Sequence, residues 1–209
     1  MQHPNLDDLT RRPARYWNVD GLPELMMGLL WIAWGGAWLI GQRIPHDSWL
    51  NVYWLVVSPA LAASGFAVMW ATRRLKERLT FPRAGYVEWK EPSRGARLRA
   101  AAVAITAAVA LAVMVLTRDT RQMEHMATPV LSVILSLSFV VASLKQRAPH
   151  YLALAGVAVA LGLSLGAMNG GWESMNWMFL ALGAACALVG GLRLALFLRQ
   201  HPRSPVEGM

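Results

Sequence analysis

The residues most able to do chemistry in this chain are Asp20 and Glu24, two acids at the start of its first apolar segment. A carboxylate there is costly unless it has a partner, so such residues are functional candidates by default. Because a helix advances about 100° per residue, Glu24 shares one sector with Gly28, Trp31, Gly35 and Trp38. This sector could line a groove in which Glu24 binds a ligand or a proton. Alternatively, the letters DGLPEL mark a helix start, where a glutamate suits the positive end of the helix dipole.

Two further features place polar groups or broken hydrogen bonding inside apolar segments. Hydroxyl side chains recur on one predicted helix face, at Thr128, Ser132, Ser136 and Ser143. This row could line a polar path, but such side chains also bond backbone carbonyls or a neighbouring helix. Pro59, in the middle of another apolar segment, predicts a kink because it removes one helical hydrogen bond.

Signs of metal or enzyme chemistry are sparse. Met123, His125 and Met126 are soft ligands that could hold Cu(I), but no repeated methionine array accompanies them, so we predict no metal site. The single cysteine, Cys186, lies in an apolar run and is expected to be a buried free thiol. The chain has no serine-nucleophile elbow, Walker loop, H-E-x-x-H or dinucleotide fingerprint. We therefore predict no enzyme activity and no cofactor.

The elements that must position these residues are membrane spans. Of the 209 residues, 56% are hydrophobic and 15% are charged, whereas soluble proteins carry about 25% charged residues. Uncharged apolar runs of roughly 18 or more residues predict spanning helices. We expect an all-α bundle of six transmembrane helices, arranged as three hairpins, at about 23–41, 49–70, 100–117, 126–144, 151–172 and 175–198. Around this domain of 23–199 lie an N-terminal segment (1–22) and a tail (200–209).

The basic residues predict the orientation. If both termini and the 71–99 and 145–150 loops share one side, that side holds 17 of the 20 Lys and Arg residues. Only Arg43, Arg118 and Arg121 remain on the other side. Since cytoplasmic loops carry the excess of Lys and Arg, we expect a multi-pass protein with both termini in the cytoplasm. The net charge of +8 then suits anionic lipid headgroups better than nucleic acid.

The 71–99 loop carries charged and aromatic residues together. Its first part, RRLKERL, continues the second span as a basic helix, and Pro82 and Gly85 then break it. Tyr86 and Trp89 predict an ordered element and a binding surface. The topology places Asp20 and Glu24 on the same side, so we expect Arg83 to pair with them and hold the loop beneath the first span.

Small residues at i, i+4 spacing predict close helix contacts. The three ridges are Ala100, Ala104, Ala108 and Ala112; Ala158, Gly162 and Gly166; and Gly183, Ala187 and Gly191. Packing within one chain explains such ridges, and a homo-oligomer interface is the alternative.

Two motifs carry a resemblance. The stretches YWNVDGLPELMMG and LTFPRAGYVEW resemble bacterial polytopic membrane proteins of uncharacterised function that carry D-G-x-x-E-L and P-R-x-G-Y-V elements. The resemblance covers roughly residues 16–90 and implies a bacterial inner-membrane protein without implying an activity.

Two functional interpretations follow. In the first, the chain is a non-catalytic membrane scaffold or accessory protein that contacts lipid or a protein partner through its cytoplasmic face. In the second, it is a small channel or transporter for an ion, a small solute or a lipid, with Glu24, Pro59 and the serine row as working parts. The scarcity of polar residues in the middle of the spans favours the first.

Overall fold

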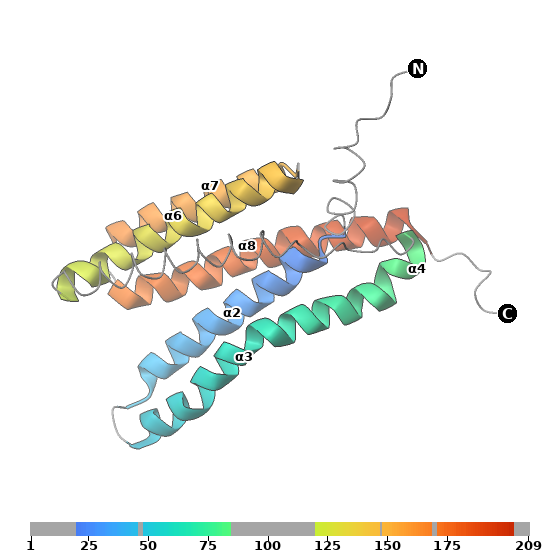
Figure 1. Ribbon diagram of the computed structural model, residues 1–209. Coiled ribbons are helices and arrows are strands. Elements are labelled where there is room, and N and C mark those ends of the chain that lie inside the picture. Colours follow the sequence, from blue (N-terminus) through green and yellow to red (C-terminus); the bar gives the residue numbers. More distant parts are fainter. Residues whose placement is uncertain (1–19, 46–47, 85–119, 147, 169–170, 203–209) are drawn as a thin grey trace, which may run out of the picture.

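The structure, a computed structural model, describes residues 20–45, 48–84, 120–146, 148–168 and 171–202, and all regular structure within them is helical (Figure 1). The helices are α2 (Leu22–Arg43), α3 (Ser48–Leu79), the short α4 (Phe81–Ala84), α6 (Thr120–Gln146), α7 (His150–Ala167) and α8 (Gly171–Gln200). All but α4 are long and apolar enough to cross a membrane, which makes five candidate spans in the described residues. The all-helical prediction is confirmed for this part of the chain, which is compatible with a polytopic membrane protein. The predicted span at 100–117 lies outside it.

Two helices are longer than a span requires. α3 has 32 residues and α8 has 30, so they are about 48 Å and 45 Å long, against about 30 Å for a hydrocarbon core. The predicted basic continuation of the second span is therefore confirmed, and α8 runs past the predicted end of the last span at 198.

Three predicted boundaries are wrong. The fifth span ends at Ala167, and Trp172 belongs to α8, which begins at Gly171 with a left-handed φ of 57° that suits glycine. The helix of the fourth span begins at Thr120 and not near residue 126, so Pro129 lies inside α6. Pro82 does not end a helix either, since α3 ends at Leu79 and Pro82 is the second residue of α4, where its missing N–H costs little.

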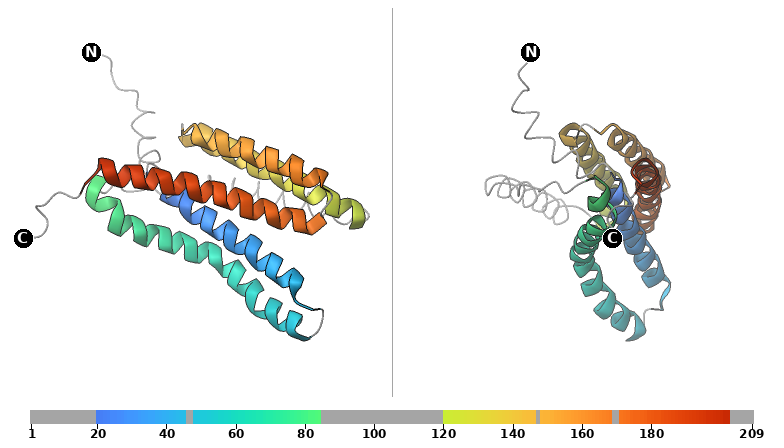
Figure 2. Two further views of the ribbon diagram at one scale, coloured as in Figure 1. Left: turned by 180° about the vertical axis from the view of Figure 1, so that it is seen from behind. Right: turned by 90° about the vertical axis from the view of Figure 1, so that its right-hand side faces the viewer.

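Helix α8 has a central place in the arrangement. It lies between the α6–α7 pair and the α2–α3 pair (Figure 1), and the view from behind gives the same order (Figure 2). The most extensive contact joins α2 and α8, which are far apart in the sequence. The most extensive single contact in the described residues is therefore one that a list of spans does not reveal.

Glycines bring α2 and α8 to backbone contact. A Cβ added at Gly28 would lie 2.5 Å from the carbonyl oxygen of Gly183, and one at Gly35 would lie 2.8 Å from that of Asn176. At Gly21, where φ is +72°, it would lie 2.5 Å from the carbonyl oxygen of Gly190. The members of these pairs recur every seven residues on both helices, a period that keeps two crossing helices in contact.

This contact corrects one prediction. Gly28 and Gly35 do not line an open groove beside Glu24, because the backbone of α8 fills the space in front of them. The sixth-span ridge is also shifted, since Gly190 faces α2 whereas nothing lies within 4 Å of a Cβ at Gly191.

The fifth-span ridge packs against α6, as intrachain packing predicted. Ala158 is fully buried. A Cβ at Gly162 would overlap the side chain of Ser132, and one at Gly166 would lie 2.8 Å from the ring of Pro129. The third ridge, at Ala100, Ala104, Ala108 and Ala112, lies outside the described residues.

An apolar cluster closes the middle of the bundle where α6, α7 and α8 meet. Its buried members are Phe139, Tyr151, Leu154, Ala155, Ala158, Leu182 and Cys186. Cys186 is a buried free thiol, as predicted. Thr128, Ser132 and Ser143 also point inward and are buried, but Phe139 lies between them along the same face of α6. Within the described residues the hydroxyl row is therefore interrupted by a phenyl ring.

Candidate functional site

The two acids singled out in the sequence lie at one end of the bundle. Helices α2 and α7 begin at this end, and α3 and α8 end there, with the short α4 beside them. Both acids are buried: Asp20 is 0% exposed and Glu24 is 4% exposed. Each has its own set of partners, which we call the Asp20 cluster (Asp20, Lys76, Thr80) and the Glu24 cluster (Glu24, His150, Tyr151, Arg193).

The Asp20 cluster ties the beginning of α2 to the end of α3. The ammonium nitrogen of Lys76 lies 2.9 Å from Oδ1 and 2.8 Å from Oδ2 of Asp20. The hydroxyl of Thr80 donates to Oδ2 at 2.7 Å, and the backbone N–H of Leu22 donates to Oδ1 at 3.2 Å. Lys76 is only 1% exposed, so this is a desolvated ion pair whose carboxylate accepts four hydrogen bonds.

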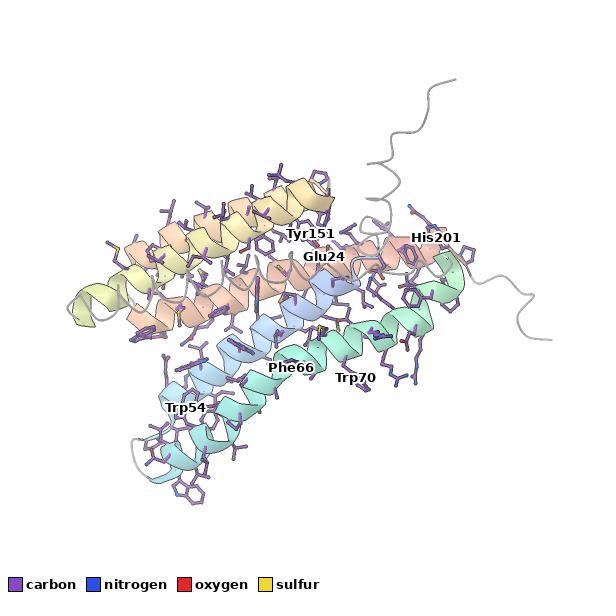
Figure 3. All side chains as sticks on the ribbon, in the orientation of Figure 1. Glu24, Trp54, Phe66, Trp70, Tyr151 and His201 are labelled. Carbon is purple, nitrogen blue, oxygen red and sulfur yellow. The ribbon has the colours of Figure 1, made fainter. Side chains whose placement is uncertain are left out.

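The Glu24 cluster joins three helices. On Oε1 of Glu24 converge the hydroxyl of Tyr151 at 2.5 Å, Nη1 of Arg193 at 3.0 Å and Nε2 of His150 at 3.1 Å. Figure 3 shows Glu24 beside Tyr151 in the bundle interior. Oε2 of Glu24 is buried and has no hydrogen-bond donor in the part of the chain that the structure describes. The three contacts in the described residues therefore meet at one oxygen, and the other oxygen has none of them.

The predicted pairing of Arg83 with the acids is wrong. Nη1 of Arg83 donates to the carbonyl oxygen of Leu79 at 2.8 Å, which caps the last turn of α3. Lys76 and Arg193 hold the two carboxylates instead. The physical reason is that α3 stays helical to Leu79, so Lys76 reaches Asp20 from inside the helix before the chain turns at Thr80. Tyr86 and Trp89, the other predicted binding residues, lie outside the described residues.

Five functional candidates were missed from the sequence, namely Lys76, Thr80, His150, Tyr151 and Arg193. The clearest signal was Arg193, the one charge in the apolar run ALVGGLRLALF. His150 and Tyr151 start a span on the same predicted side. Lys76 was hidden by its exposed neighbours, because a basic helix end usually faces solvent or headgroups.

The arrangement can hold charges and move a proton over a short distance. Glu24, His150 and Tyr151 are acid–base groups within hydrogen-bond reach, and Arg193 supplies a permanent positive charge. In the described residues no group of three or more His, Cys, Asp or Glu side chains could hold a metal ion. The side chains of Met123 and His125 lie outside the described residues, so the structure does not test whether they bind Cu(I).

Searches against protein-family models, curated proteins and solved structures found no match for this chain.

Proposed function

We propose that the chain is a non-catalytic scaffold of the bacterial inner membrane that gathers anionic lipid headgroups at its cytoplasmic end. In this proposal both termini are cytoplasmic and residues 100–117 form the sixth span. The lipid-binding surface is the basic platform, which we define as Trp70, Arg73, Arg74 and Arg78 at the end of α3.

The observation that carries the proposal is the Asp20 cluster. Its buried ion pair fixes the last turns of α3 to the start of α2. Arg74 and Arg78 on the opposite face of α3, and Arg73 closer to Lys76, are therefore held on a rigid element. The side chains of Arg73 and Arg74 are 75% and 62% exposed and share the carboxylate of Glu77, at 3.4 Å and 3.6 Å. Arg78 is exposed as well. A preorganised cationic surface loses less conformational entropy when it binds headgroups than a flexible one does.

The aromatic member of the platform supports a position at the membrane surface. Trp70 is 64% exposed, and the guanidinium of Arg74 lies 5.8 Å from the centre of its ring. Tryptophan prefers the headgroup level of a bilayer, where each nearby Lys or Arg gains about 1 kcal/mol from anionic lipid. Trp70 would therefore mark the depth at which the arginines meet headgroup phosphates.

The packing of the bundle interior favours a scaffold rather than a channel. Between the Glu24 cluster and the polar residues of the other half lies the apolar cluster around Phe139, Leu182 and Cys186. Backbone contact between α2 and α8 fills the space beside Glu24. A path for ions or solutes would have to cross this dry layer, at a cost of several kcal/mol for each unsolvated polar group.

Lipid retention tests the proposal. Purified protein is exchanged into nanodiscs that contain equal amounts of phosphatidylglycerol and phosphatidylcholine, and the lipids that stay bound after detergent extraction are counted by native mass spectrometry. The triple variant Arg73→Gln, Arg74→Gln, Arg78→Gln should retain at least about tenfold less phosphatidylglycerol, given about 1 kcal/mol for each arginine. Phosphatidylcholine should be unaffected.

A charge-matched control uses the opposite side. Replacing Arg43, Arg118 and Arg121 by glutamine removes the same charge and should lower phosphatidylglycerol retention clearly less than the platform variant does. Equal losses in both variants would contradict a specific platform. Liposomes with the wild-type protein could show a proton or solute flux above that of protein-free liposomes. If Glu24→Gln abolishes this flux, the scaffold proposal is wrong and the chain is a channel or transporter.

A further inference from the structure

His150 in the Glu24 cluster has contacts that no single protonation state can satisfy. Its Nε2 lies 2.7 Å from Nη1 of Arg193 and 3.1 Å from Oε1 of Glu24. Arginine only donates hydrogen bonds and a carboxylate only accepts them. One ring nitrogen therefore faces a permanent donor and a permanent acceptor at the same time.

Each protonation state of Nε2 allows a hydrogen bond with one neighbour and prevents the hydrogen bond with the other. Without a proton on Nε2, its lone pair accepts the hydrogen bond of Arg193, and the lone pairs of Nε2 and Glu24 face each other. With a proton on Nε2, the imidazole donates to Glu24, and N–H groups of His150 and Arg193 oppose each other. In the doubly protonated ring, like charges of His150 and Arg193 repel as well.

We propose that His150 is a proton-binding site that selects whether its own ring bonds α8 or α2, beside the bond that Tyr151 makes from α7 to Glu24 of α2. Neutral His150 accepts from Arg193 and links α7 to α8. Protonated His150 donates to Glu24 and links α7 to α2, while Arg193 moves away from the ring. This inference does not depend on the scaffold proposal, because it concerns the interior of the bundle and not the basic platform.

The second carboxylate oxygen makes this exchange feasible. Oε2 of Glu24 is buried without a donor in the described part of the chain, so Arg193 can shift from Oε1 to Oε2 and remain paired. The side chain of Arg193 is 26% exposed and that of His150 is 20% exposed. The proton can thus arrive from the solvent side without opening the bundle.

The groups that face His150 define what else could titrate. On α2 it meets Glu24, and on α8 it meets Arg193, with the buried thiol of Cys186 deeper in the same helix. On α7 itself the ring of Tyr151 lies 4.3 Å away. The described side chains of α6 carry no charge, and Lys76 of α3 is bonded to Asp20. Histidine is the side chain that ordinarily changes charge between about pH 5 and 8.

Nitrogen NMR on the whole chain tests the proposal directly. The chain has five histidines, so a background with glutamine at the other four leaves His150 as the only labelled imidazole. In nanodiscs at pH 8 we expect Nε2 to be unprotonated and to accept a hydrogen bond, with the proton on Nδ1. At pH 5 both nitrogens should carry a proton. A ring protonated on Nε2 at pH 8, or one whose state does not change down to pH 5, would overturn the proposal.

The response of Arg193 gives a second measurement. Its guanidinium nitrogen signals should shift between pH 8 and pH 5 in the wild type and in His201→Gln. His201 is a suitable control because its ring lies against the carbonyl oxygen and the ring of Phe197. The shift should disappear in His150→Gln. An unchanged Arg193 shift in that variant, or none in the wild type, would contradict a selector role, and the single-histidine measurement stands even if the variant does not fold.

Discussion

Asp20 and Glu24 lie four residues apart at the same end of α2, yet the two carboxylates are treated in opposite ways. Asp20 spreads four hydrogen bonds over both oxygens, and its donors come from the helix start and the end of α3. Glu24 collects its neighbours on a single oxygen, and one of them, His150, is shared with Arg193. Within the described residues, Asp20 is saturated and Glu24 is not.

The difference teaches how a buried charge can be fixed or adjustable. A carboxylate with every lone pair used has one favourable arrangement, and any movement breaks a bond in a medium that offers no replacement. A carboxylate with a spare oxygen and a shared histidine has room for a second arrangement. We therefore assign the Asp20 cluster to the mechanical stability of the bundle and the Glu24 cluster to a response.

The largest expected effect comes from breaking the saturated cluster. Asp20→Ala removes the carboxylate that pairs with the buried ammonium group of Lys76, so we expect a loss of about 3–5 kcal/mol in the free energy of unfolding. Reversible unfolding in mixed micelles measures it. Glu173→Ala, at an exposed carboxylate near the start of α8, is the control and should change little.

A double variant separates the pair from its individual members. Asp20→Ala combined with Lys76→Met removes both charges and keeps an apolar chain of similar length, so it should recover much of the lost stability. If the double variant is as unstable as Asp20→Ala alone, the buried ion pair is not the reason for the loss.

Removing one member of the Glu24 cluster should lower the free energy of unfolding by less than Asp20→Ala does. Tyr151→Phe deletes the hydroxyl that donates to Glu24 at 2.5 Å, and hydrogen bonds to charged groups contribute about 1.5–3 kcal/mol. The remaining donors can redistribute over both oxygens of Glu24, so the measured loss in the same unfolding assay should fall below that of Asp20→Ala. A loss equal to or above that of Asp20→Ala would erase the distinction between the two clusters.

Much of the secondary structure was predictable because helix length and hydrophobicity are properties of continuous segments of the sequence. Segment length, the lone Glu24 and the small-residue spacing of α7 identified helices and one true packing face. The pairing of charges was not predictable in the same way. The topology rule gives the depth of a residue in the membrane, but it does not give its direction around the helix axis relative to distant helices.

The Arg83 prediction failed for this reason. Judged by depth in the membrane alone, Arg83, Lys76 and Arg193 could each reach an acid of α2. Which of them forms the pair depends on the contact between α2 and α8. That contact is set by glycines spaced seven residues apart, whereas the ridges sought in the sequence had a spacing of four. A search for heptad glycines on two separate segments would have brought Gly28 opposite Gly183 and Glu24 towards Arg193.

The smallest expected effect tests whether this glycine contact positions the Glu24 cluster. Gly28→Ala places a methyl group 2.5 Å from the carbonyl oxygen of Gly183, so α2 and α8 must separate, at a cost of about 1–3 kcal/mol. Gly36→Ala is the matched control on the same helix, because nothing lies within 4 Å of a Cβ there. It should be neutral or slightly stabilising, since alanine favours the helix more than glycine does.

The same substitution should act on one cluster and not on the other. Arg193 belongs to α8, so separating α8 from α2 lengthens the bond between Arg193 and Glu24, whereas Lys76 reaches Asp20 from α3. In Gly28→Ala the guanidinium signals of Arg193 should change, and the ammonium signal of Lys76 should stay as in the wild type. Equal disturbance of both signals would mean that the two clusters form one mechanical unit, and the contrast between a fixed and an adjustable carboxylate would have to be abandoned.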